Sequence, residues 1–201
     1  MGQITVQRDI GGMKGLCLIC PTVHGDDRGY FLEVYNRRDM KAAGFDIDFV
    51  QDNQSLSTKG VLRGLHFQKQ HPQTKLVRVI KGSAFDVVVD LRQGSESYGR
   101  WHGEVLSAEN RKQVLIPRGF AHGFLVLTET AEICYKCDDF YRPDDEGGMA
   151  WNDPALGIVW PGVTGAYRGT ASAVGYCLDG VALKLSDRDQ QWPEIRDAFR
   201  F

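Results

Sequence analysis

Short stretches of apolar, strand-like text separated by polar or glycine-containing turns recur along this chain and restrict the folds that it can adopt. They cover residues 60–68, 76–80, 84–91, 103–106, 113–116, 120–127 and 131–136. Short strands spaced at about 8–12 residues are typical of a β-sandwich or a β-barrel. Glycine supplies 23 of the 201 residues, as a chain with many turns requires. We therefore predict one all-β domain over residues 1–201, an antiparallel barrel or jelly roll with minor helices at its ends.

Local signals place the turns and the helices. Lys81-Gly82-Ser83 separates two strand-like stretches and predicts a hairpin with glycine at the turn. The polar residues 55–59 predict a second turn. Helix-forming sequence is confined to residues 37–43 and 192–199, and Pro193 suits the first turn of the second helix.

Charge and hydropathy argue against two classes of partner. Lys and Arg number 24 against 26 Asp and Glu, a formal charge of −2, which gives no general affinity for nucleic acid or an anionic membrane. No apolar stretch approaches the ~20 residues of a transmembrane helix. The first 15 residues carry charges where a signal peptide has its apolar core. We expect a cytoplasmic protein that binds neither nucleic acid nor membrane.

The cysteines suggest a reducing compartment. There are five, an odd number at low density, which favours free thiols over a disulfide framework. Cys17 with Cys20, and Cys134 with Cys137, form two CxxC pairs and so a formal zinc candidate. Both pairs lie in strand-like text, where residues i and i+3 point to opposite faces. We expect buried, unreactive thiols here.

Two polar side chains interrupt otherwise apolar strand faces. His122 shares a face with Phe120 and Phe124, and Tyr135 shares one with Ile133. A histidine and a tyrosine in such positions are either hydrogen-bonded core residues or the lining of a barrel that holds a polar ligand. The choice between these interpretations depends on what accompanies them elsewhere in the chain.

Six motifs occur in one order along most of the chain. They are DRGYFLE at 27–33, QDNQS at 51–55, VLRGLHFQ at 61–68, TKLVRV at 74–79, IPRGFAHGF at 116–124 and WNDP at 151–154. Together they closely resemble the dTDP-4-dehydrorhamnose 3,5-epimerase family, from about residue 22 to 161 and again at LSDRD, 185–189. The resemblance implies a cupin-like jelly roll, a homodimer, and an isomerase that needs no cofactor and no metal.

The implied reaction inverts C3 and C5 of a nucleotide-linked 4-keto-6-deoxy sugar. In this family it converts dTDP-4-dehydro-6-deoxyglucose to dTDP-4-dehydro-L-rhamnose, a step of dTDP-rhamnose and deoxysugar biosynthesis. A proton must leave a carbon beside the ketone, and another must return on the opposite face. Such chemistry requires a base, an acid on the other side, and a donor for the enolate oxygen.

The resemblance assigns these tasks to four residues. His66 corresponds to the general base, Tyr135 to the proton donor, and Lys75 to the residue near the C4 oxygen. Asp189 corresponds to the carboxylate that orients the base and stabilises its imidazolium. An ordinary tyrosine pKa near ~10 keeps Tyr135 protonated at neutral pH. Asp86 is a second candidate partner for His66, because the placement of Asp189 is open.

That placement depends on residues 162–184, a stretch that is longer than we expect for the family and resembles an insertion.

The resemblance also implies further substrate contacts at Arg28, Phe31, Glu33, Gln51, Asn53, Arg63, Lys75, His122, Tyr141, Glu146 and Arg188. Guanidinium groups suit bidentate phosphate binding, amides and carboxylates suit a pyrimidine edge, and aromatic rings stack on a base. The implied homodimer places Arg28, Phe31 and Glu33 in the neighbouring subunit's site, with strands of 1–50 contributing to the contact.

One feature of this assignment conflicts with regular strand geometry. Arg63 and His66 are three residues apart, so a regular strand would direct them to opposite faces. A β-bulge at Gly64 would bring both to the same side.

Other functions compete with a cofactor-free double epimerase. In a metal-dependent cupin, His66, His122 and an acidic residue would bind the metal. Gln68 stands where such sites usually place a second histidine, and His71 follows a turn, so we expect no metal site. A non-catalytic sugar-nucleotide-binding module would need no acid and no base. Epimerisation at C3 or C5 alone is not distinguished by these motifs.

Overall fold

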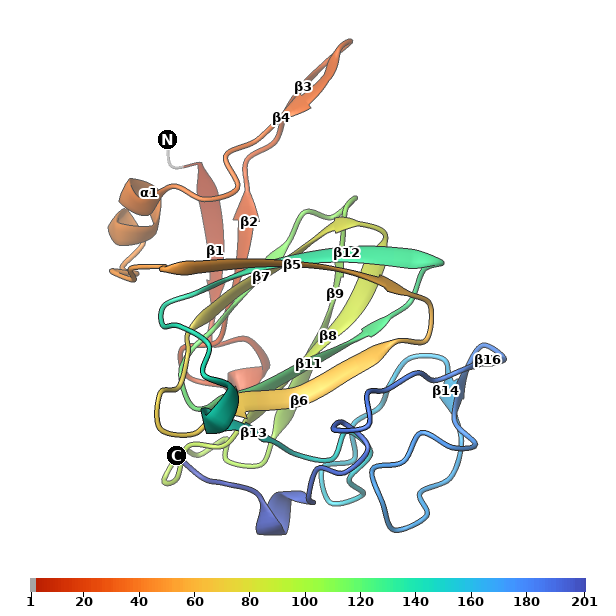
Figure 1. The fold of residues 1–201 in the computed structure, drawn as a ribbon. Helices are drawn as coiled ribbons and strands as arrows, with labels where there is room; N and C mark the ends of the chain where they lie inside the picture. Colours follow the sequence, from red (N-terminus) through yellow and green to blue (C-terminus); the bar gives the residue numbers. More distant parts are fainter. Residues whose placement is uncertain (1–2) are drawn as a thin grey trace.

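Two antiparallel sheets face each other across a shared interior in the computed structural model, which describes residues 3–201 (Figure 1). The first sheet has the order β1 (Ile4–Arg8), β2 (Cys17–Pro21), β10 (Gln113–Ile116), β7 (Lys75–Lys81), β12 (Thr130–Cys137) and β5 (Gln51–Thr58). The second has the order β13 (Glu146–Gly148), β6 (Leu62–Gln68), β11 (Phe120–Val126), β8 (Ser83–Asp90) and β9 (Trp101–Ser107). The predicted all-β jelly-roll class is confirmed.

The remaining elements are short. They are β3 (His24–Asp26) and β4 (Gly29–Phe31), α1 (Arg37–Ala42), the 3-10 turns Ile10–Gly12, Pro143–Asp145 and Ile195–Asp197, and the strands β14 (Val163–Thr164), β15 (Cys177–Leu178) and β16 (Val181–Ala182). None of the helices in residues 3–201 has the length and apolarity needed to cross a membrane.

The five-stranded sheet is buried on both faces. In β11, Phe124 and Val126 pack into the core between the sheets, whereas Ala121 and Leu125 pack against Trp151 on the other face. The C-terminal part of the chain lies along that second face (Figure 1). Burial on both faces explains why the sequence of β11 is continuously apolar.

The predicted helix near residue 37 is confirmed as α1. Asn36 caps it, its side chain accepting a hydrogen bond from the Arg38 N–H. Met40 is the helix's buried residue and packs on Ile19 and Leu115 of the six-stranded sheet. A single apolar side chain thus anchors a short helix to the outer face of that sheet.

The predicted hairpin at Lys81-Gly82-Ser83 is wrong in its pairing. The turn is present, but β7 and β8 belong to different sheets. Gly82 has a φ of +67°, and a Cβ there would lie 2.0 Å from the Thr130 carbonyl oxygen. The glycine correctly signals a tight reversal of the chain. The two strands that it joins then enter opposite sheets, with their apolar faces toward the common interior, and do not pair with each other.

Two other local predictions are corrected. The predicted turn over 55–59 lies within β5 up to Thr58, because its serines alternate with exposed residues and Ser57 is buried in the interior. The predicted helix over 192–199 is reduced to the 3-10 turn Ile195–Asp197. There the Asp153 carboxylate accepts the Ile195 N–H at 2.6 Å, so tertiary contacts replace helical ones.

Residues 162–184 fold onto the body of the protein. Their short strands β14, β15 and β16 form a three-stranded sheet, and Tyr176 stacks edge-on against Trp151 with ring centroids 4.9 Å apart. Lys184 then forms a parallel bridge with Val61, just before β6. This bridge leads residues 185–189 along the start of β6.

The two cysteine pairs lie on different strands. Cys17 and Cys20 belong to β2 and Cys134 and Cys137 to β12, with β10 and β7 between them. Three strand spacings amount to roughly 14 Å, so the four thiols do not converge. All five cysteines are free; Cys17 and Cys137 are buried as expected, whereas Cys20 and Cys134 are only half-buried.

Asp90 holds the loop after β8. It is fully buried, and its carboxylate accepts hydrogen bonds from Arg92, Ser95 and Ser97 at 2.6–3.0 Å. Burial raises its pKa, but these hydrogen bonds outweigh burial and lower the pKa to about 2.

Asp90→Asn is expected to lower the free energy of unfolding by about 1–3 kcal/mol at pH 7. Because the folded pKa lies below the unfolded value near ~3.9, the wild-type advantage is present above that value and lost as pH falls toward about 2. Urea unfolding of both proteins from pH 7 down to the acid limit of folding measures this difference. Asp144→Asn, at an exposed position, is the control. A gap that stays constant across this range would contradict the assignment.

Candidate active site

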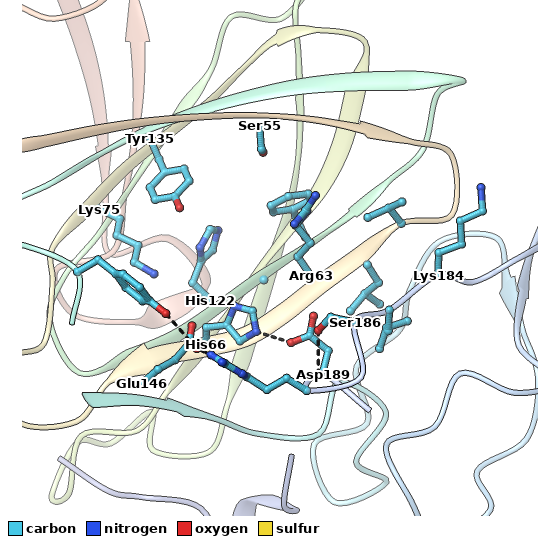
Figure 2. Close-up of a pocket in the computed structure, with 17 residues that line it drawn as sticks. Ser55, Arg63, His66, Lys75, His122, Tyr135, Glu146, Lys184, Ser186 and Asp189 are labelled. Atoms are coloured by element: carbon cyan, nitrogen blue, oxygen red, sulfur yellow. Dashed lines mark hydrogen bonds and ion pairs between the residues drawn. The ribbon is translucent and has the colours of Figure 1, made fainter. Parts of the chain in front are cut away.

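A cavity of about 720 Å³ opens between the two sheets. It is lined by the side chains shown in Figure 2, among them nine predicted site residues: Arg63, His66, Lys75, His122, Tyr135, Tyr141, Glu146, Arg188 and Asp189. A smaller adjoining cavity of about 270 Å³ adds Gln51 and Asn53. The structure therefore brings most of the predicted residues into one place.

His66 of β6 is hydrogen-bonded through Nε2 to the carboxylate of Asp189. Asp189 is 3% exposed. Burial raises its pKa, but hydrogen bonds with His66, Ser186 and Trp192 outweigh burial and hold the pKa below its usual value. A carboxylate that stays ionised orients the imidazole and stabilises its protonated form. Of the two candidate partners, Asp189 is the one that contacts His66.

The opposite wall carries Tyr135 of β12 and Lys75 of β7. Burial raises the pKa of Tyr135, so its hydroxyl keeps its proton more firmly than an ordinary tyrosine. Burial lowers the pKa of Lys75. Both groups are therefore suited to donate a proton or a hydrogen bond inside the cavity.

These groups face each other across the space. Figure 2 shows Tyr135 and Lys75 entering the cavity from one side and His66 with Asp189 from the other. A flat molecule between the walls would have a base on one face and an acid on the opposite face. Removal of a proton on one side and its return on the other requires that arrangement.

A β-bulge in β6 brings Arg63 and His66 into the same cavity. His66 pairs with His122 while Arg63 pairs with Phe124, so three steps on β6 match two on β11. A Cβ at Gly64 would lie 2.6 Å from the Gly123 Cα, which explains the glycine. The predicted bulge is confirmed, and the Arg63 guanidinium reaches Ser57 Oγ at 3.2–3.3 Å.

The profile of the family described as dTDP-4-dehydrorhamnose 3,5-epimerase matches residues 11–197. The chain belongs to the dTDP-4-dehydrorhamnose 3,5-epimerase family. A curated member from Methanothermobacter thermautotrophicus is 45% identical over 186 residues, 92% of each chain. One from Pseudomonas aeruginosa is 57% identical over 142 residues, 70% of this chain and 78% of that one.

Solved structures of epimerases have the same architecture. The Legionella pneumophila 3,5-epimerase in complex with dTDP-4-keto-L-rhamnose superposes with a TM-score of 0.84, at 39% identity over 98% of both chains. A Streptomyces bikiniensis 3'-monoepimerase in complex with dTDP-quinovose gives 0.77, at 33% identity over 91% of this chain and 85% of that one. The family fold therefore includes enzymes described as double and as single epimerases.

At one end of this epimerase cavity, polar side chains are held in a network. Glu146 forms an ion pair with Arg188 and accepts a hydrogen bond from the Tyr141 hydroxyl at 3.3 Å. The Gln51 amide donates to Asn53 Oδ1 at 2.9 Å and accepts the Tyr141 N–H at 2.8 Å. This network of amide, carboxylate and aromatic groups is suited to bind a nucleobase.

Three predicted contacts of the epimerase do not reach the cavity within this chain. Arg28 and Phe31 lie on the β3–β4 hairpin, which projects away from the two sheets (Figure 1), and Phe31 is 66% exposed. Arg28 forms an ion pair with Asp26, and Glu33 accepts a hydrogen bond from Asn36 at 3.2 Å.

Sequence reasoning missed several lining residues of this epimerase. Ser55, Lys184 and Ser186 line the cavity. The available signal was their place in the motifs: Ser55 lies in QDNQS, Ser186 in LSDRD, and Lys184 directly precedes LSDRD. His66 and His122, the two histidines of the metal alternative, are each bonded to a carboxylate, Asp189 and Asp86. In the part of the chain that the structure describes, no group of three or more His, Cys, Asp or Glu is placed to hold a metal ion.

Asp189→Asn is expected to lower kcat by at least about 10²-fold, because the amide no longer stabilises the imidazolium of His66. KM for the sugar nucleotide should change far less. Steady-state kinetics measure both, with Ser186→Ala, which removes the acceptor of the Asp189 backbone N–H, as a milder comparison. A near-normal kcat in Asp189→Asn would show that His66 works without this carboxylate.

Proposed function

We propose that this chain catalyses the 3,5-epimerisation of dTDP-4-dehydro-6-deoxyglucose to dTDP-4-dehydro-L-rhamnose. The observation that carries the proposal is the opposition of His66 and Tyr135 across one cavity, in a chain of the epimerase family. Conversion of one sugar isomer into another requires no net transfer of electrons or protons. The protein's own acid and base are sufficient for such a reaction.

His66 takes the proton from the carbon next to the ketone and becomes an imidazolium, which Asp189 stabilises. The electron pair of the broken C–H bond moves into the enolate, whose C4 oxygen accepts a hydrogen bond from Lys75. Tyr135 then protonates the carbon from the opposite face, and solvent restores both groups. The same sequence at the second carbon completes the double inversion.

The nucleotide part is assigned to the other end of the cavity. Arg63 binds the diphosphate, Gln51 and Asn53 bind the pyrimidine edge, and Tyr141 stacks on the ring. Glu146 and Arg188 supply further contacts there, and His122 contacts the sugar beside Lys75 and His66. Support for dTDP comes from the Legionella pneumophila relative, whose structure is described as a complex with dTDP-4-keto-L-rhamnose.

Inversion at one carbon is the second candidate. It is favoured by the Streptomyces bikiniensis 3'-monoepimerase, which shares this fold at 33% identity. Proton NMR of the substrate with enzyme in deuterated water separates the two, because exchange at C3 and at C5 is scored independently.

The chain is further proposed to work as a cytoplasmic homodimer. The β3–β4 hairpin presents Arg28 and Phe31 away from its own cavity, so a two-fold partner can receive them. Arg28, Phe31 and Glu33 then complete the neighbouring nucleotide site. We further propose that residues 162–184, the stretch that is longer than expected for the family, support the cavity wall through the bridge between Lys184 and Val61.

His66→Ala is expected to abolish solvent exchange at every carbon beside the ketone, with a rate loss of about 10²–10⁴-fold, because no enolate forms. Tyr135→Phe is expected to block inversion while the base still works, so that deuterium returns to the original face. Both variants are incubated with substrate in deuterated water and followed by NMR. Exchange that survives in His66→Ala, or normal inversion in Tyr135→Phe, would reverse the assignment.

Subunit mixing tests the shared site. Arg28→Ala and His66→Ala are each expected to be impaired, yet their heterodimer contains one site with intact His66 and intact Arg28. A fully exchanged equal mixture should regain about a quarter of wild-type activity. Arg63→Ala mixed with His66→Ala is the control, because both residues belong to one chain's cavity and no intact site forms. Recovery in neither mixture would contradict the exchange of arms.

A further inference from the structure

Asp86 is a buried carboxylate to which the reaction scheme gives no task. It lies on β8 between Ala84 and Val88, which pack into the core between the sheets, so it points into the same interior. The residue is 3% exposed. Its Oδ2 accepts a hydrogen bond from His122 Nε2 at 2.8 Å, whereas its buried Oδ1 has no hydrogen-bond partner within residues 3–201.

The contact with Asp86 fixes the state of His122. An ionised carboxylate only accepts hydrogen bonds, so the proton sits on Nε2 of the imidazole. Nδ1 is then left as an acceptor in a side chain that lines the cavity. Figure 2 shows this ring between the side chains of Lys75 and His66. Asp86 therefore reaches the reacting space through His122.

A buried carboxylate with one unpartnered oxygen requires a compensating positive charge. Lys75 supplies one. Burial lowers the pKa of the Lys75 ammonium, and the charges of Cys137 and Asp86 oppose that effect. Throughout residues 3–201 no carboxylate lies within 4 Å of the Lys75 ammonium, so its N–H groups stay available to a substrate oxygen.

Other charged and titratable groups border this corner. They are Arg63 and His66 of β6, Tyr135 and Cys137 of β12, His102 and Glu104 of β9, and Lys112. Glu104 is bound to Lys112 at 2.6 Å. Burial raises the pKa of Cys137 to about 11, which leaves that thiol uncharged at neutral pH. Asp86 is the carboxylate whose charge raises the pKa of Lys75 against the effect of burial.

We propose that Asp86 is a positioning residue of the enolate-binding corner: it fixes the tautomer of His122 and keeps the Lys75 ammonium charged without forming a salt bridge to it. The inference rests on the proposed epimerase function of Lys75. A direct ion pair would occupy the ammonium and compete with the substrate's C4 oxygen. A carboxylate placed behind His122 supplies the charge and leaves the donors free.

Asp86→Asn tests this directly. Without the carboxylate, the pKa of Lys75 loses the contribution that opposes burial, so the alkaline limb of the kcat–pH profile should move to lower pH. In Lys75→Arg the cation does not titrate in this range, so adding Asp86→Asn should leave the limb of that variant in place. Glu104→Gln is the matched control, since it removes an equal charge from the strand next to Asp86, and its limb should not move. An alkaline limb at the wild-type pH in Asp86→Asn, with kcat lowered equally at every pH, would overturn the proposal.

A second measurement needs neither turnover nor an intact fold of Asp86→Asn. In Lys75→Met the carboxylate loses its compensating cation, so protonation of His122 should extend to higher pH than in the wild-type protein. Histidine-labelled NMR follows the five rings, with His122 assigned by its loss in His122→Asn. An unchanged His122 titration would overturn the link between Lys75 and Asp86. Failure of the wild-type protein to exchange substrate protons would instead count against the epimerase function alone.

Discussion

The hydrogen bond between His66 and Asp189 joins residues 123 positions apart in the chain, and much of the structure serves to make it possible. His66 is set by β6 in the middle of the fold, whereas Asp189 arrives from the C-terminal part that covers the outer face of the same sheet. The bridge between Val61 and Lys184 aligns the two segments before they meet. The packing that buries the outer core thus also brings Asp189 to the proposed base, His66.

The interior between the sheets is apolar in one part and polar in another. Val77, Val79 and Ile133 fill one part of the core, and on the same strands Lys75 and Tyr135 face the cavity. Strand alternation keeps both kinds of residue on one face. The apolar core on these strands therefore positions Tyr135 and Lys75, the proposed acid and the proposed enolate donor.

Sequence patterns predicted what is local and missed what depends on distant packing. Alternation located the seven strand-like stretches from 60 to 136, and Gly64 was identified as a bulge because Arg63 and His66 otherwise face apart. Whether the strands around Gly82 pair with each other or join opposite sheets is decided by the whole barrel. The choice between Asp86 and Asp189 likewise required the path of residues 162–184, which no local pattern gives. The family motifs supplied the site residues, and the geometry brought most of them together, leaving Arg28, Phe31 and Glu33 on the outside of a single chain.

The late position of Asp189 in the chain determines when its contact with His66 can form during synthesis. A ribosome has made every strand of both sheets by Gly148, including those that carry His66, Lys75 and Tyr135. The carboxylate partner of His66 emerges about forty residues later, after residues 162–184 have supplied their share of the outer core. A nascent or prematurely terminated barrel therefore has the proposed proton donor but lacks one wall of the cavity and the carboxylate that orients the proposed base. The contact between His66 and Asp189 therefore forms only after both sheets have been synthesised.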